Sequence, residues 1–272
     1  MNTQTPHNPT RSDARPPTPR QMERNLIAIA SGKGGVGKTF FSITLAHAMA
    51  RRGLKVLLFD GDLGLANVDV QLGLSVNRDL NNVVEGHISL AQAVQRYERG
   101  GFDILAGRSG QASLSTLPLQ RLNEILKQLR MLAQDYDAVL IDLGAGVDKS
   151  IRFLASAAGT MIVVTTEDPT ALTDAYALIK LSHAAGHADT AHIVVNQADN
   201  ERSGQRTIQT LQRACENFLK IRPPALGFVR HDRHVRDSVR SQTPLLIRSP
   251  NSEAAEDIED IAARVLARVQ QL

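Results

Sequence analysis

The stretch SGKGGVGKT, residues 31–39, has the composition of a loop that binds phosphate groups. Residues 32–39 fit the pattern G-x-x-x-x-G-K-[ST], in which glycines let the backbone curl so that its N–H groups converge on phosphate oxygens. Lys38 is placed to neutralise the β- and γ-phosphates of a nucleotide, and the Thr39 hydroxyl to bind Mg²⁺. The nucleotide is therefore expected to be bound by Gly32, Lys33, Gly34, Gly35, Val36, Gly37, Lys38 and Thr39.

Three aspartates stand where a metal and a reactive water would be held. Asp142 follows four apolar residues, as a Walker B aspartate does when it holds Mg²⁺ through its water shell. Asp60 and Asp62 lie two residues apart at the end of another apolar run, so both can point into one Mg²⁺ and water site. One could place the metal and the other could orient the attacking water, because phosphoryl transfer depends mainly on positioning and charge neutralisation. The alternative for Asp142 is a strand-ending aspartate that caps the next turn, and the alternative for Asp60 and Asp62 is a turn built on Asp and Gly.

The remaining polar candidates are weaker. Asn196 ends the run HIVVN, and its amide offers both a donor and an acceptor to an adenine edge; the alternative is an ordinary loop asparagine. The sequence continues as NQAD and lacks the N-K-x-D pattern of guanine recognition. The histidines are scattered without ligand spacing, so no structural metal is predicted. Cys215 is the single cysteine, which excludes an internal disulfide.

These residues follow apolar runs that alternate with amphipathic stretches such as 119–134 and 171–186. Apolar strands separated by helices predict an α/β fold: a doubly wound, mostly parallel sheet with helices on both faces. Ligands bind beyond the carboxyl ends of such strands, which is where the candidate residues stand. The predicted strands are LIAIA (26–30), KVLLFD (55–60), FDILAG (102–107), AVLIDL (138–143), TMIVVTT (160–166), HIVVNQ (192–197) and ALGFV (225–229).

The two ends of the chain differ in character. Residues 1–25 are rich in Pro, Thr, Arg and Asn and predict a disordered tail, either a plain leader or a partner-binding arm. One domain is expected over 26–272, ending in an amphipathic helix over 254–271. That helix either packs on the sheet or lies on a membrane with Arg264 and Arg268 at the headgroups; its many acidic residues and its lack of aromatic residues favour packing.

Composition limits the cellular setting. No run of about 18 apolar residues exists, and the first residues lack the apolar stretch of a secretory signal. We therefore expect a cytoplasmic protein, with peripheral contact at the inner membrane as the alternative. The net charge of +3 neither demands nor excludes nucleic acid.

Four motifs occur in a fixed order between Leu26 and Val239: KGGVGKT, DGDLGLANVD, IDLGAG and TTEDPTALTDAY. Together they resemble the MinD/ParA family of deviant Walker A (P-loop) ATPases. Within it, GLANVDVQLGL and EDPTALTDAYALIK are most similar to the FlhG (FleN) group of flagellar number regulators. The resemblance implies a P-loop NTPase fold of the MinD (SIMIBI) type and a Mg²⁺-dependent ATPase that hydrolyses ATP when two copies sandwich it.

The resemblance also implies roles for single residues. Lys33 matches the signature lysine, which reaches across the dimer to the phosphates of the partner. Asp62 matches the carboxylate that positions water, and Asp60 and Asp142 match the Mg²⁺ side. Lys33, Lys38 and Asp62 are thus the expected catalytic residues, and the metal is expected at Thr39, Asp60 and Asp142.

The resemblance assigns roles to two asparagines. At two other places the sequence differs from the usual motifs of the family. Asn67 matches an asparagine near the dimer interface, and Asn196 an adenine contact. The family usually has a proline in the adenine-side loop, where this chain has Arg230. FlhG proteins commonly carry a motif that activates the partner GTPase FlhF, and RQMERN (20–25) does not match it.

Three functions are consistent with these residues. The first is an ATP-dependent dimerising switch for flagellar number or placement, acting on flagellar assembly or regulatory proteins. The second is a ParA-like positioning ATPase that binds DNA non-specifically. Its support is a basic stretch that includes Arg202, Arg206, Arg213, Lys220, Arg222, Arg233, Arg236, Arg240 and Arg248. The third, an ATPase coupled to a reductase or iron–sulfur carrier, is disfavoured by the single cysteine.

Overall fold

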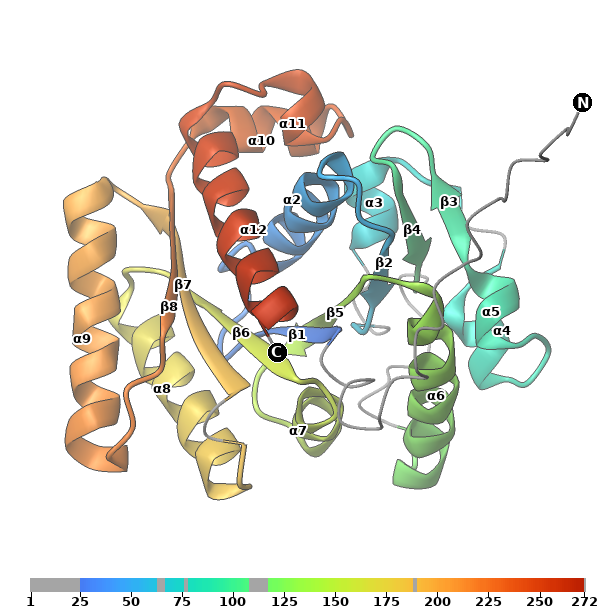
Figure 1. Ribbon diagram of the computed structural model, residues 1–272, viewed down its shortest axis with the longest axis horizontal. Helices are drawn as coiled ribbons and strands as arrows, with labels where there is room; N and C mark the ends of the chain where they lie inside the picture. The colour runs from blue at the N-terminus through green and yellow to red at the C-terminus, as the bar shows by residue number, and fades with distance from the viewer. Residues whose placement is uncertain (1–24, 63–66, 76–77, 108–116, 188–189, 272) are drawn as a thin grey trace, which may run out of the picture.

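The computed structural model describes residues 25–271, apart from 63–66, 76–77, 108–116 and 188–189 (Figure 1). The tail predicted over 1–25, with the stretch 20–25, therefore lies almost wholly outside the described residues. The described chain forms an eight-stranded sheet in the order β3-β4-β2-β5-β1-β6-β7-β8. The strands are β1 (Leu26–Ser31), β2 (Val56–Asp60), β3 (Gln95–Tyr97), β4 (Phe102–Leu105), β5 (Ala138–Ala145), β6 (Thr160–Thr165), β7 (Ala191–Ala198) and β8 (Ala225–Arg230).

All neighbouring strands are parallel except β3 and β4. The central strands β1, β2 and β5 are mostly apolar because both of their faces are buried, and their polar residues stand near their carboxyl ends; every residue of β1 and β2 is buried. Each strand predicted from an apolar run forms within two residues of its expected ends. The short antiparallel edge strand β3 was not predicted, because its sequence, QRY, contains no apolar run.

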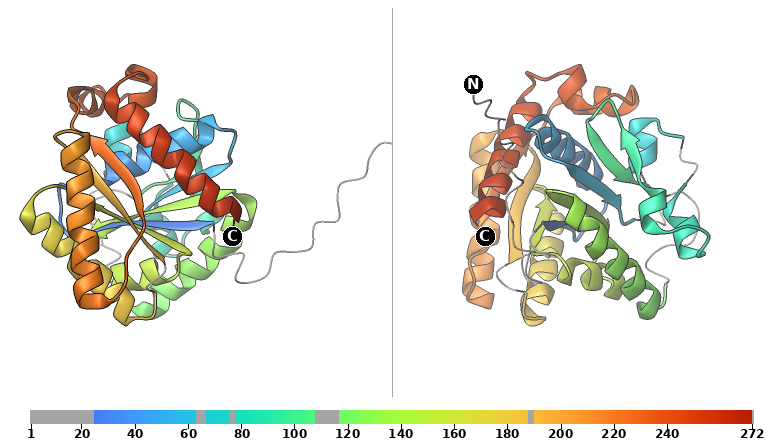
Figure 2. Two further views of the ribbon diagram at one scale, coloured as in Figure 1. Left: turned by 60° about the vertical axis from the view of Figure 1, so that its left-hand side comes forward. Right: turned by 45° about the vertical axis from the view of Figure 1, so that its right-hand side comes forward.

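Helices cover both faces of the sheet, as the predicted fold class requires (Figure 2). One face carries α2 (Lys38–Arg51), α3 (Val68–Leu72), α10 (Arg233–Arg240), α11 (Leu245–Arg248) and α12 (Glu253–Gln271). The other carries α4 (Leu80–Val84), α5 (Leu90–Ala93), α6 (Leu119–Leu132) with the 3₁₀ turn Ala133–Asp135, α7 (Lys149–Ser156), α8 (Pro169–Ala184) and α9 (Glu201–Leu219). Two separate hydrophobic cores result, one on each face of the sheet.

The last helix, α12, packs into the core rather than standing free, as its acidic face led us to expect (Figure 1). It lies against β8 and α2, and Glu259 forms ion pairs with Arg51, the last residue of α2, and with Arg52, which follows it. Arg264, which a membrane-bound helix would turn to lipid headgroups, donates to the carbonyl of Leu226 at 2.9 Å. No helix in the described part of the chain is long and apolar enough to cross a membrane. The buried side chains of α12 include Ala254, Ala255, Ile258, Ile261, Ala262 and Val265.

This packing predicts a large effect of trimming one side chain of α12. Ile261 is 1% exposed, so Ile261→Ala should lower the free energy of unfolding by about 2–5 kcal/mol, the usual cost of such a truncation in a core. Ala267 of the same helix is exposed, and Ala267→Ser should change stability by no more than about 0.5 kcal/mol. Urea denaturation of the two variants measures the difference. Equal midpoints would contradict the docking of α12.

Candidate functional site

The glycine-rich loop joins the end of β1 to the start of α2, and it is pressed against two neighbours. A Cβ at Gly32 would lie 2.3 Å from the backbone oxygen of Asp174 in α8. Gly37 has the left-handed φ of 83°, and a Cβ there would lie 2.3 Å from the amide nitrogen of Asn196. Both positions therefore require glycine, and the curvature of the loop follows from these contacts.

Asp142 gathers the phosphate-binding and metal-binding candidates at the carboxyl end of β5. Its Oδ1 accepts from Lys38 Nζ at 2.8 Å and from Ser42 Oγ at 2.8 Å, and its Oδ2 accepts from Thr39 Oγ1 at 2.7 Å. Lys38 and Asp142 are both buried, so this ion pair is shielded from water. Ser42 was not predicted, although it stands one helical turn after Lys38 and thus on the same face of α2.

Asp60 lies beside Asp142 because β2 and β5 pair in parallel with these two residues in register. Its carboxylate accepts from the backbone N–H of Val68 at 3.3 Å and of Asp62 at 3.2 Å. Burial, reinforced by the charge of Asp142, raises the pKa of Asp60 to about 8. Two buried carboxylates and the Thr39 hydroxyl form an all-oxygen donor set, which fits Mg²⁺ and would be stabilised by a cation.

Asp62 and Asn67 flank residues 63–66, which lie outside the described chain. Asp62 is half-buried, and a Cβ at Gly144 would come 3.5 Å from its carboxyl carbon, so the glycine leaves room for Asp62 beside β5. Asn67 is exposed at the N-terminal cap position of α3, and its side chain makes no capping hydrogen bond there. The fold thus brings Asp62 to the Asp142 side of the site, while Asn67 faces solvent.

A bulge at the end of β7 turns two consecutive amides toward the loop. Asn196 is buried and its Nδ2 donates to the carbonyl of Val36 at 2.8 Å. Gln197 has a left-handed φ of 58°, and its Nε2 lies 3.4 Å from the carbonyl of Gly35. Successive side chains of a regular strand point to opposite faces, so the distorted backbone is what aims both amides at one loop. The structure therefore gives Asn196 a bracing contact, and the bracing by Gln197 was not predicted.

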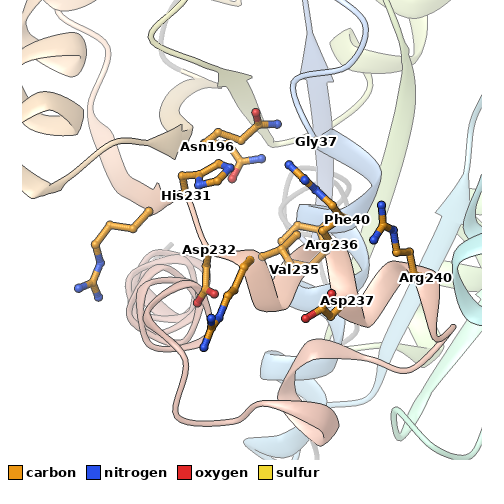
Figure 3. A pocket seen from close by; sticks show the side chains of 12 residues that line it. Gly37, Phe40, Asn196, His231, Asp232, Val235, Arg236, Asp237 and Arg240 are labelled. Carbon is orange, nitrogen blue, oxygen red and sulfur yellow. The ribbon is translucent and has the colours of Figure 1, made fainter.

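A cavity of about 390 Å³ opens beside Gly37, between the loop, the end of β7 and α10 (Figure 3). Phe40 and Asn196 lie in its wall, so its size and position suit a nucleoside whose phosphates enter the loop. Arg230 also lines it. The guanidinium of Arg230 is held by α12, with nitrogen–oxygen distances of 2.9 Å to Asp257 and 2.8 Å to Glu253.

Lys33 points away from Lys38 and binds the start of α8. Its ammonium donates to the hydroxyl of Thr170 and lies 3.5 Å from Asp168 Oδ2. Asp168 caps α8, and hydrogen bonds from the Thr170 hydroxyl and from the first backbone N–H groups of α8 lower the pKa of Asp168 to about 2. Lys33 is 41% exposed, so it sits on the rim of the site, held by its own chain.

His234 and Cys215 lie outside the phosphate-binding site. His234 Nδ1 lies 2.7 Å from Asp232 Oδ1, and among the described residues no group of three or more His, Cys, Asp or Glu side chains is arranged to hold a metal ion. Cys215 is buried in α9, and burial raises the pKa of its thiol to about 11.

Comparison with known proteins shows which family shares this sequence. The family described as CobQ/CobB/MinD/ParA nucleotide binding domain matches residues 27–245. The chain belongs to this family. It is 34% identical over 240 residues to the antiactivator FleN of Pseudomonas aeruginosa, covering 88% of this chain and 85% of that protein. It is 29% identical over 247 residues to the flagellum site-determining protein YlxH of Helicobacter pylori, covering 90% and 83% respectively.

Solved structures of family members share the fold. The septum site-determining protein MinD of Pyrococcus horikoshii, solved in complex with Mg-ADP, superposes with a TM-score of 0.76 at 28% identity. The match covers 90% of this chain and 97% of that one. Family membership makes the chain a nucleotide-binding protein of the MinD/ParA ATPase type, and the loop at residues 32–39 stands within the matched region.

The burial of Lys38 yields a prediction for nucleotide binding. Lys38→Ala removes the cation at the phosphate end of the loop, so ATP affinity should fall by about 10- to 100-fold, as expected for a lost charge-assisted hydrogen bond. Titration calorimetry with Mg-ATP measures the loss, and circular dichroism checks that the variant folds. Lys127 is exposed on α6, and Lys127→Ala should bind ATP normally. Undiminished binding by folded Lys38→Ala would refute this assignment of the loop.

Proposed function

We propose that this chain is an ATP-dependent switch that dimerises around Mg²⁺-bound ATP, hydrolyses it, and so regulates the number or placement of flagella. The observation that carries the proposal is the separation of the two loop lysines. Lys38 is buried on Asp142, while Lys33 is exposed on the rim. One lysine suffices for the phosphates of a chain's own nucleotide, so the second can bind the phosphates of a nucleotide held by another copy.

Each residue of the site has a separate task in this proposal. The loop and Lys38 bind the phosphates, and a phosphate oxygen takes the place that Asp142 occupies beside Lys38. Thr39, Asp60 and Asp142 would hold Mg²⁺, which neutralises the developing charge during phosphoryl transfer. Asp62 holds the attacking water, and Asn196 fixes the loop beside the base. Asn67, exposed beside this site, contacts the second copy.

Lys33 has to change partners before the dimer can form. In the single chain it is bound to Asp168 and Thr170, and reaching a second chain's phosphate breaks that contact. An exposed ion pair contributes little free energy, so a phosphate with several negative charges can displace it. The contact therefore keeps Lys33 ordered without preventing assembly.

The flagellar role is supported by the names of the relatives FleN and YlxH. We propose that the partners are a second copy of the chain and flagellar assembly or regulatory proteins, encountered in the cytoplasm. The apolar face of α12 is occupied by β8 and α2, so that helix is not proposed as a membrane anchor.

A DNA-binding positioning ATPase is the second candidate. Arg202 and Arg206 of α9 are exposed, and within the described residues neither forms an ion pair. A mobility shift with duplex DNA at two salt concentrations separates the candidates, because phosphate contacts weaken steeply with salt. Strong, salt-sensitive binding that requires ATP would favour the second candidate over the first.

The proposal predicts that Lys33→Ala separates binding from hydrolysis. The variant should bind ATP with normal affinity but stay monomeric, and hydrolysis should fall by about 10³-fold or more, as when a cation supplied in trans is removed. Chromatography with light scattering in Mg-ATP, together with phosphate release, measures both effects.

The matched variant Asp168→Asn keeps a capping side chain but removes the charge that holds Lys33. It should dimerise at lower protein concentration than the natural chain. A Lys33→Ala protein that dimerises and hydrolyses ATP normally would overturn the role of Lys33.

Asp62→Ala should have the opposite phenotype. Because its carboxylate acts on the water and not on the phosphates, the variant should bind ATP and dimerise, yet hydrolyse ATP at least about 100-fold more slowly. The measurement is the lifetime of the dimer after free ATP is removed by rapid desalting. A variant that stays monomeric, or whose dimer decays at the natural rate, would show that Asp62 has another role.

A further inference from the structure

Helix α10 presents a stripe of arginines to the cavity beside the phosphate loop. Arg233, Arg236 and Arg240 are spaced three and four residues apart, so they lie on one face of the helix. All three are exposed and line the cavity next to Gly37, and Figure 3 labels Arg236 and Arg240 among the lining side chains. The opposite side of α10 buries Ser238 and packs Val239 against the core.

The positive charge of this stripe is only partly offset by its neighbours, since Asp232 and Asp237 line the same cavity. Arg230, at the rim of the same cavity, is held by three carboxylates of α12. By contrast, the side chains of Arg233, Arg236 and Arg240 form no ion pair or hydrogen bond with any described residue. Like charges at this spacing repel one another and destabilise the helix slightly, so the stripe has a cost that a bound anion would remove.

The stripe is held on a rigid support. At the start of α10, Asp232 accepts from the backbone N–H of His234 at 2.9 Å and of Ala254 at 3.3 Å. At its end, Gln242 takes the left-handed φ of 49° and its Nε2 donates to the carbonyl of Val70 in α3 at 2.9 Å. A helix tied at both ends presents its side chains with little loss of freedom on binding.

A simple adenine nucleotide does not use these charges. Its 5′ phosphates belong to the glycine loop and Lys38, and its base and ribose are neutral. The three arginines of α10 outnumber the carboxylates of Asp232 and Asp237 at this cavity, and the excess positive charge fits a second anionic group set at a distance from the first. A cavity of about 390 Å³ has room for a nucleoside with one more phosphate, whereas a nucleic acid duplex is far too wide to enter it.

We propose that the base end of this site binds adenine nucleotides that carry a further phosphate on the ribose, with Arg233, Arg236 and Arg240 as its ligands. The inference rests on the proposed nucleotide site and adds a second ligand class to it. Such a nucleotide would compete with ATP for the loop and would bind α10 more strongly than ATP does. It would thereby reduce the fraction of the chain that carries the ATP needed for dimerisation.

Competition calorimetry with the full chain and Mg²⁺ tests this. Adenosine 3′-phosphate 5′-diphosphate should bind about tenfold tighter than ADP, as two or three charge-assisted hydrogen bonds allow. In the double variant Arg236→Gln, Arg240→Gln this advantage should vanish while ADP affinity is kept. The charge-matched control Arg202→Gln, Arg206→Gln, on the exposed face of α9, should keep the advantage.

The possible outcomes distinguish the binding of a 3′-phosphorylated nucleotide from the proposed function itself. Equal affinity of the natural chain for ADP and its 3′-phosphorylated form would overturn this inference and leave the proposed function standing. So would an advantage that survives in the α10 double variant, or duplex DNA that displaces ADP through the same arginines. Failure to bind ADP at all would overturn the proposed function, and this inference with it.

Discussion

A buried carboxylate is the constraint on which the site depends. Asp142 has no exposed surface, so its charge is stable only where donors surround it. Lys38, Thr39 and Ser42 supply three donors from the first turns of α2. The start of α2 is thereby tied to the end of β5, and the glycine loop has to span the distance between β1 and that helix. A nucleotide phosphate can use the same arrangement, because it is an anion that can bind Lys38 and Thr39 in place of Asp142.

The loop is restrained on two further sides, which leaves one of its side chains for another purpose. Gly32 touches α8, and the amides of Asn196 and Gln197 reach the carbonyls of Val36 and Gly35. A phosphate site needs this rigidity, because catalysis of phosphoryl transfer rests on positioning. The Lys33 side chain is directed to the rim, where a partly exposed ion pair with Asp168 holds it. A rigid site with one cation held only by a partly exposed contact is what the proposed completion by a second copy requires.

Much of this could be predicted from the sequence. Apolar runs ending in polar residues gave the strands, and glycine spacing gave the loop, because both patterns report local geometry. Contacts between segments that are distant in the sequence produce no such local pattern of residues. The edge strand Gln95–Tyr97 has no apolar run, and the sequence NQAD does not predict that Gln197 adopts a left-handed backbone conformation. The arginines of α10 looked like part of a general basic stretch, and only the fold shows that Arg236 and Arg240 line the cavity beside the phosphate loop.

The central claim is that each active site takes Lys33 from a second copy and Asp62 from its own chain. Mixing Lys33→Ala with Asp62→Ala protein tests this most directly, through ATP hydrolysis measured as a function of the mixing ratio. In a mixed dimer, the Lys33→Ala subunit keeps its own Asp62 and receives Lys33 from its partner, so one complete site forms. We predict hydrolysis that neither variant shows alone and that is greatest near equal amounts. If Lys33 acts on its own chain's nucleotide, no mixture will exceed the activity of the separate variants, and the account is wrong.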